Sequence, residues 1–134
     1  MTLIDTNVLL DVFTRDSTWL DWSLARLEQA AIAGPLIIND VIYAETSTRY
    51  PSIDGFETAL ADVGVSVLPI PRTALFLAGK AFTQYRRAGG LRTGVVSDFF
   101  IGAHAAVEKL PLLTRDSRRY RSYFPTVVLI TPDN

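Results

Sequence analysis

The chain has 134 residues, a formal net charge of −1 and no cysteine. Its length is typical of one domain, which we expect to cover residues 1–134. The near-neutral charge argues against a general nucleic-acid coat, and the lack of cysteine excludes disulfides and thiolate metal sites. No apolar run approaches the ~18 residues of a membrane span, and Asp5 stands where a signal peptide needs basic residues. We therefore expect a cytoplasmic protein without a membrane anchor.

Short apolar runs alternate with amphipathic segments in the first half of the chain. The apolar runs predict strands at Thr2–Ile4, Leu36–Ile38 and 65–68. The amphipathic segments predict helices over 7–13, 18–33, 40–50 and 54–63. The residues of the second helix that we expect to face the core are Leu20, Leu24, Leu27 and Ala31.

Capping signals mark the ends of these helices. The N-terminal signal is an acceptor side chain followed three residues later by an acid, in the pairs Thr18 with Asp21 and Asp54 with Glu57. Asn39 or Asp40 is expected to cap the third helix. Gly34 and Gly64 are expected to end the second and fourth helices, because glycine is favoured just after a helix.

The alternation continues through the second half of the chain. Helices are expected over 73–88, 95–108 and 116–123, and strands over 112–114 and 126–130. In the first of these helices, the residues expected to face the core are Leu75, Ala78, Phe82 and Tyr85. Because strands alternate with helices and read as continuous apolar runs, we expect an α/β fold of three layers. Its centre would be a parallel sheet of about five strands with helices on both faces.

Four acidic residues are expected near the ends of the strands. Asp5 directly follows the first strand, and the fourth strand leads through Arg115 to Asp116. Glu45 lies on the helix after the second strand, and Asp98 begins an apolar helix. Ligands bind beyond the carboxyl ends of the strands in open parallel sheets. Each acid also has a structural interpretation, since Asp98 and Asp116 would complement helix dipoles and Glu45 would pair with Arg49.

The four acids together favour a metal site. Carboxylates gathered at one sheet edge repel one another and stay ionised only if a cation neutralises them. Oxygen ligands are typical of a hard ion, so the sequence predicts Mg²⁺, with Mn²⁺ as a substitute, rather than zinc. Such an ion also binds phosphate and activates water, which is the chemistry that phosphodiester hydrolysis needs.

Four short motifs, which span nearly the whole chain, resemble those of PIN domains. They are IDTNVLL at 4–10, AE at 44–45, SDFFIGAHA at 97–105 and LTRD at 113–116. The chain departs from the usual pattern at Phe99 and Phe100, which are bulkier than is common. It also has Lys109, Leu110 and Pro111 where a glycine often stands. These departures leave the four acidic positions unchanged.

The resemblance implies a PIN-like fold and a Mg²⁺-dependent endoribonuclease, in which metal-activated water cleaves RNA. By this likeness the catalytic pocket consists of Asp5, Glu45, Asp98 and Asp116. Asp5, Asp98 and Asp116 would be the metal ligands, while Glu45 would bind a second ion or orient water. The residues expected to support this pocket by hydrogen bonds are Thr6, Asn7 and Thr114.

The compact form of the chain is similar to the VapC-type toxins of type II toxin–antitoxin pairs. That likeness implies an RNA substrate, a cognate antitoxin and a homodimer. A haloacid-dehalogenase phosphatase is excluded, because it needs a second aspartate at position 7, where this chain has Asn7. The alternative that stays open is a non-catalytic PIN-like module that binds RNA or a partner.

Arginine makes up eleven of the thirteen basic residues. Arginine suits phosphate well, and several arginines flank two of the acids in the sequence. The candidate RNA contacts are Arg86, Arg87, Arg92 and Arg115. A solvated surface is an equally open interpretation of these residues. His104 lies six residues after Asp98 and so on another face of the helix, where we expect packing rather than catalysis.

Overall fold

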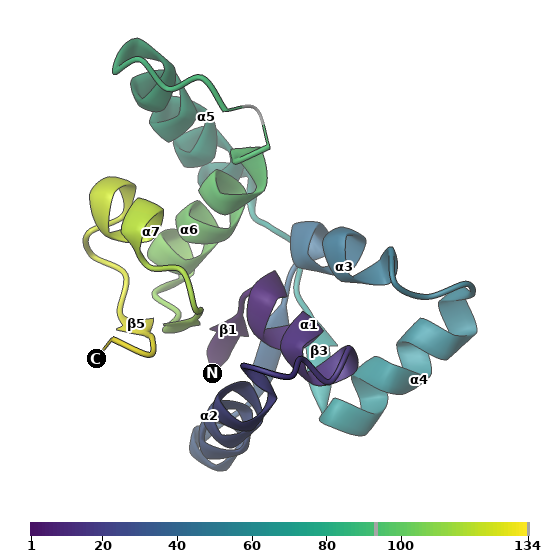
Figure 1. Ribbon diagram of the computed structural model, residues 1–134. Helices are drawn as coiled ribbons and strands as arrows, with labels where there is room; N and C mark the ends of the chain where they lie inside the picture. The colour runs from purple at the N-terminus through teal and green to yellow at the C-terminus, as the bar shows by residue number, and fades with distance from the viewer. Residues whose placement is uncertain (93, 134) are drawn as a thin grey trace.

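A five-stranded parallel sheet forms the centre of the protein (Figure 1). The computed structural model describes residues 1–92 and 94–133. The strands follow the order β3-β2-β1-β4-β5, so the first strand of the chain lies in the middle. Their bounds are β1 (Thr2–Ile4), β2 (Leu36–Ile38), β3 (Val65–Val67), β4 (Leu112–Leu113) and β5 (Leu129–Ile130). The predicted parallel sheet of about five strands is confirmed.

Helices flank the sheet and complete the predicted α/β/α arrangement. Their bounds are α1 (Thr6–Phe13), α2 (Leu20–Ala33), α3 (Asp40–Ser47), α4 (Ile53–Val63), α5 (Arg72–Arg87), α6 (Val96–Glu108) and α7 (Arg118–Tyr123). α6 packs against α5, α3 and α7, while α1 packs against α2 and α3. In the described part of the chain, no helix is long and apolar enough to cross a membrane.

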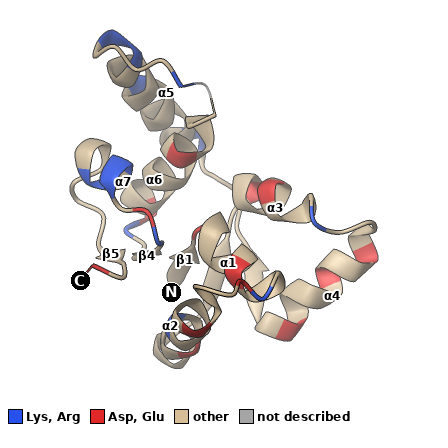
Figure 2. Ribbon diagram, in the orientation of Figure 1, with Lys and Arg blue, Asp and Glu red and all other residues tan. Residues whose placement is uncertain are grey.

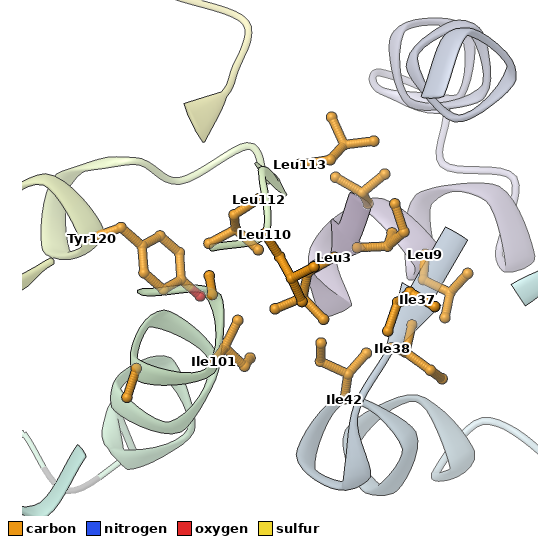
Figure 3. Close-up of a cluster of buried hydrophobic side chains, with 14 of the residues drawn as sticks. Leu3, Leu9, Ile37, Ile38, Ile42, Ile101, Leu110, Leu112, Leu113 and Tyr120 are labelled. Atoms are coloured by element: carbon orange, nitrogen blue, oxygen red, sulfur yellow. The ribbon is translucent and has the colours of Figure 1, made fainter. Parts of the chain in front are cut away.

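The core lies where the central strands meet the flanking helices (Figure 3). Leu3 of β1 pairs with Ile37 of β2 on one side and with Leu112 of β4 on the other. Ile42 from α3 and Ile101 from α6 are fully buried beside these strands. Because β1 is fixed from both sides, the residue that follows it is held at the middle of one sheet edge.

The caps of α3 and α4 decide where these helices begin and end. Asn39 caps α3, as one of the two predicted residues, and its Oδ1 accepts hydrogen bonds from the backbone N–H groups of Val41 and Ile42. Gly64 ends α4 as predicted, with a φ of 82° that favours glycine. The predicted start of α4 was wrong, because Ser52 rather than Asp54 is the cap and accepts from the Gly55 N–H.

The predicted start of α2 at Thr18 was also wrong. The Asp16 carboxylate accepts hydrogen bonds from the backbone N–H groups of Thr18 and Trp19, which forms a turn before the helix. The helix begins at Leu20. An aspartate can bind backbone N–H groups two or three residues later. Asp16 thereby accepts the Thr18 N–H, which the side chain of Asp21 would accept in a capping box.

Bulky residues that were predicted to face inward are partly exposed on two helices. On α5, Ala78 is buried as predicted and Phe82 and Tyr85 pack against the core, but Leu75 is 41% exposed. The other buried residues of this helix are small, namely Ala74 and Ala81. On α2, Leu24 is 40% exposed, whereas Ser23 is buried. The small alanine side chains let α5 lie close to α6. On α2, Ser23 can be buried because its hydroxyl donates a hydrogen bond to the buried Asp11.

Three other predicted features differ near the ends of the sheet and the chain. α7 begins at Arg118 instead of residue 116, and β5 is limited to Leu129–Ile130. The third strand was expected to be buried on both faces, but Ser66 and Val67 of β3 are exposed. β3 is an edge strand, so only β2 covers it laterally.

Candidate active site

One pocket of about 220 Å³ brings together the four predicted acids, Asp5, Glu45, Asp98 and Asp116. They come from the end of β1, from α3, from the first turn of α6 and from the segment after β4. The other lining residues are Thr6, Asn7, Leu10, Arg119 and Tyr120. The pocket is at the carboxyl end of the central strands, where a parallel sheet places its ligands. We call it the acidic pocket.

Asp5 is the most buried of the four acids, with 4% of its surface exposed. Its Oδ1 accepts the Thr6 N–H at 2.7 Å. Its Oδ2 accepts the hydroxyls of Thr114 at 2.7 Å and of Tyr120 at 2.9 Å. Burial raises the pKa of Asp5 to about 6, although these hydrogen bonds lower it and the nearby Asp98 adds to the rise. Near neutral pH, therefore, the carboxyl group is held close to its titration point by burial.

Asp98 faces a cation from its own chain. Its Oδ2 lies 2.5 Å from Nη1 of Arg119, and both side chains are partly exposed, at 30% and 21%. Burial raises the pKa of Asp98, while the hydrogen bond and charge of Arg119 lower it. The charges of Asp116 and Glu45 raise it further. Arg119 is therefore the positive charge that this structure places among the acids.

Glu45 and Asp116 are held at the rim of the acidic pocket by neighbouring polar groups. The Thr6 hydroxyl donates to Oε1 of Glu45 at 2.7 Å, which connects α1 to α3. Asp116 is exposed, and its backbone N–H donates to the Thr114 hydroxyl at 3.1 Å. The contact of Glu45 with Thr6, rather than the suggested pairing with Arg49, orients this carboxylate toward the site.

Asn7 and Thr114 fix the segment after β4, as the sequence predicted for supporting residues. The Asn7 amide donates to the Thr114 hydroxyl at 3.3 Å, and its carbonyl accepts the Arg115 N–H at 3.1 Å. Together with the bond from Thr114 to Asp5, these contacts link the start of α1 to the segment that carries Asp116. The predicted supporting residues thus connect two of the acids.

The donor set of the acidic pocket fits a hard divalent ion, because every candidate ligand is a carboxylate oxygen. In their present positions, no three acidic or histidine side chains of residues 1–92 and 94–133 are grouped closely enough to hold a metal ion. Two of the acids have partners within the chain, since Asp5 accepts hydrogen bonds from two hydroxyl groups and Asp98 pairs with Arg119. Arg119 thus lines the same pocket as the four acids and pairs with one of them, Asp98.

The predicted RNA-binding arginines lie in three different places. Arg86 and Arg87 are exposed at the end of α5, where Figure 2 shows basic ribbon segments away from the acidic pocket. Arg92 lines a neighbouring groove. Arg115 makes a bidentate ion pair with the buried Asp11, at 2.6 and 2.9 Å, and its guanidinium lies 4.9 Å from the Trp19 ring centroid. Arg115 therefore anchors the segment after β4 to α1.

The PIN domain family profile matches residues 2–124 of the chain. The chain belongs to the PIN domain family. The match includes the four acids and the two residues that hold Asp5, Thr114 and Tyr120. A comparison with curated protein sequences gives no match.

Several solved structures share the fold of this PIN domain. VapBC2 from Rickettsia felis, bound to a DNA fragment from its promoter, is similar with a TM-score of 0.73 and 17% identity over 97% of each chain. FitAcB from Neisseria gonorrhoeae gives 0.71 and 17%, over 100% of this chain and 99% of that one. A toxin–antitoxin complex from Klebsiella pneumoniae gives 0.63 and 23%, over 96% of both. At these identities the likeness concerns the fold.

Two residues of the acidic pocket were missed by sequence reasoning as members of the site. Tyr120 is buried and donates to Asp5, and this environment raises its pKa well above the ordinary value, chiefly through burial. Arg119 was visible only as one of several arginines after Asp116. Both are on α7, and nothing in the periodicity of so short a helix distinguishes the residues that face the site.

Proposed function

We propose that this PIN domain is a Mg²⁺-dependent endoribonuclease that hydrolyses RNA phosphodiester bonds. The observation that carries the proposal is the convergence of four carboxylates from separate elements on one pocket. Carboxylates are costly to gather without a cation, and a hard ion is the partner that oxygen ligands favour. Membership of the PIN family supports the same chemistry.

Asp5, Asp98 and Asp116 would hold Mg²⁺, or Mn²⁺ as a substitute. When bound, the ion would supply an activated water and neutralise charge that develops on the phosphate. Thr114 and Tyr120 would orient Asp5 through the hydroxyl hydrogen bonds that they already donate. Glu45, oriented by Thr6, would bind a second ion or position the water.

We further propose that the protein is the VapC-type toxin of a toxin–antitoxin pair and acts in the cytoplasm as a homodimer. Support comes from the similar structures, which include VapBC2 and a toxin–antitoxin complex matched over nearly the whole of both chains. The partner would be a cognate antitoxin. Co-expression with the product of the adjacent gene tests this part, since the complex should copurify and its RNA cleavage should be suppressed.

The test of the enzymatic proposal is cleavage of a single-stranded or looped RNA by the purified protein with Mg²⁺, with Mn²⁺ and with excess chelator. We expect cleavage with either ion, products with a 5′-phosphate and a 3′-hydroxyl, and loss of activity in chelator. Asp98→Asn should reduce activity to background while the protein stays folded. Cleavage at full rate in chelator would contradict the proposal.

A second candidate function is a non-catalytic module that binds RNA or a partner. The ion pair between Arg119 and Asp98 favours it, because a guanidinium already neutralises one of the acids. This candidate predicts that RNA binds equally well with Mg²⁺ or chelator and is recovered intact under all conditions. The same cleavage experiment therefore separates the two functions.

A further inference from the structure

A second cavity, of about 370 Å³, lies beside the acidic pocket. Its lining residues are Tyr85, Arg92, Asp116, Arg118, Arg119, Ser122 and Tyr123. We call it the arginine groove. Asp116 and Arg119 line both cavities, so the arginine groove and the acidic pocket share a wall. A ligand that extends from the acidic pocket past Asp116 and Arg119 therefore enters the arginine groove.

The arginine groove concentrates positive charge in a protein whose net charge is −1. Three arginines line it beside one carboxylate, and Figure 2 shows basic ribbon on α7 next to acidic ribbon. Arg92 and Arg118 are exposed, and no carboxylate of residues 1–92 and 94–133 pairs with either guanidinium. These two guanidinium groups are therefore available to an anionic ligand.

The remaining walls of the arginine groove are aromatic and fixed in place. The Tyr85 and Tyr123 rings pack against Phe99, with centroids 5.5 and 5.2 Å away. The Tyr85 hydroxyl accepts the Arg92 N–H at 3.2 Å, which holds the backbone of Arg92 beside the groove. Guanidinium groups next to aromatic rings are typical of surfaces that bind single-stranded nucleic acid, whose backbone is anionic and whose bases are flat.

We propose that the arginine groove binds the single-stranded RNA backbone on one side of the bond to be cleaved, with Arg92 and Arg118 contacting phosphates. This inference rests on the proposed function, which puts one phosphate at the acidic pocket. The next phosphates of the same strand then lie at the arginines across the shared wall. Arg86 and Arg87, which were also predicted from the sequence, line neither cavity and are not part of this site.

The test compares Arg92→Gln/Arg118→Gln with Arg86→Gln/Arg87→Gln, which has the same change of net charge outside the groove. Binding of a labelled single-stranded RNA is measured in chelator, where no cleavage is expected, over a range of salt concentrations. Each lost phosphate contact should reduce the salt slope by about 0.7, and the loss of two should weaken binding about tenfold near 0.15 M salt. The control pair should keep the slope of the parent.

Melting curves and competition by inorganic phosphate serve as controls for the RNA-binding comparison. Melting curves should show that both double variants fold and that Mg²⁺ raises their melting temperatures equally, because neither variant changes a proposed metal ligand. Inorganic phosphate should compete only weakly, whereas competition equal to that of RNA at matched phosphate concentration would mean a simple anion site. Equal RNA binding by the two double variants would overturn the proposal.

The experiments distinguish a wrong assignment of the arginine groove from a wrong assignment of the ribonuclease function. If the parent cleaves RNA with Mg²⁺ but the groove variants bind RNA as the parent does, the function stands and the groove assignment is wrong. If the groove variants lose RNA binding but the parent never cleaves, the groove stands and the protein is a binding module.

Discussion

Arg119 is a counter-ion of Asp98 in the acidic pocket, and it would compete with the metal ion that we propose for this site. A divalent cation at Asp98 must displace the guanidinium that lies 2.5 Å from its carboxylate. Because both side chains are partly exposed, water screens the pair, and its loss costs about 0–1 kcal/mol. If Mg²⁺ binds as we propose, competition from Arg119 would weaken that binding by up to about fivefold.

We predict that Arg119→Gln binds Mg²⁺ up to about fivefold more tightly than the parent. The measurement is the rise in melting temperature during a Mg²⁺ titration, or calorimetry. Arg118→Gln is the matched control, since it removes the same charge from the neighbouring position, which has no ion pair with an acid of the pocket. Weaker Mg²⁺ binding by Arg119→Gln than by Arg118→Gln would show that Arg119 supports the ion instead.

The acids could be located from the sequence, but their counter-charge could not. Asp5 and Asp116 come just after predicted strands, and the parallel direction of the strands brings such residues to one edge. Arg119 and Tyr120 reach the pocket through the orientation of α7, which depends on tertiary packing against α6. A helix of six residues carries too little periodicity to show which side faces inward.

Among the elements, α1 and the segment after β4 are joined by an ion pair between Asp11 and Arg115. Asp11 is 3% exposed and also accepts the Ser23 hydroxyl at 2.6 Å. Arg115 contributes two hydrogen bonds and lies against the Trp19 ring. Removing Arg115 would leave a buried carboxylate with one remaining partner, which is costly.

We predict that Arg115→Met lowers the free energy of unfolding by about 3 kcal/mol, because breaking a buried pair strands the remaining charge. Asp11→Asn should cost less, since Arg115 can turn to solvent. Chemical denaturation measures both values. Folded Arg115→Met should bind RNA with the same salt dependence as the parent. A flatter salt dependence with no loss of stability would mean that Arg115 contacts RNA after all.

The elements themselves were largely predictable, because most strands are compact apolar runs and most of the longer helices have an apolar face. The errors concern local polar contacts and residue size. Asp16 forms a turn that moved the start of α2, and Ser52 replaced Asp54 as the cap of α4. On α5 the buried residues are alanines, and the predicted inner face was right at Ala78 but wrong at Leu75, which is exposed beside the buried Ala74.

The stability of the whole molecule should depend on pH through His104, which is 1% exposed on α6. Asn39 uses its carbonyl to cap α3, so its amide nitrogen donates to Nδ1 of the neutral imidazole at 3.0 Å. Burial lowers the pKa of His104, although the charges of Glu108 and Asp40 oppose this. The folded protein therefore binds a proton less readily than the unfolded chain, whose histidine titrates near the ordinary value.

We predict that this histidine makes stability fall as the pH drops below about 6.5, the ordinary histidine value, toward its lower folded pKa. The unfolded chain takes up the proton first, which favours unfolding. His104→Gln retains an acceptor for Asn39 but does not titrate, so it should lose less stability than the parent between pH 7.5 and 5.5. The raised pKa of Asp5 acts in both proteins and cancels in the comparison. Identical pH profiles would contradict the prediction.

The central position of β1 also determines when the acidic pocket is finished during synthesis. A ribosome delivers the chain from its N-terminus, and Asp5 emerges long before Thr114, which is 109 residues later in sequence. β4 and Tyr120 follow α5 and α6 in the chain, so the hydroxyls that orient Asp5 appear only after these helices. A growing chain thus has an incomplete pocket until residue 120 has been added. If the protein cleaves RNA as we propose, this connectivity delays that activity until β4 and α7 have joined β1.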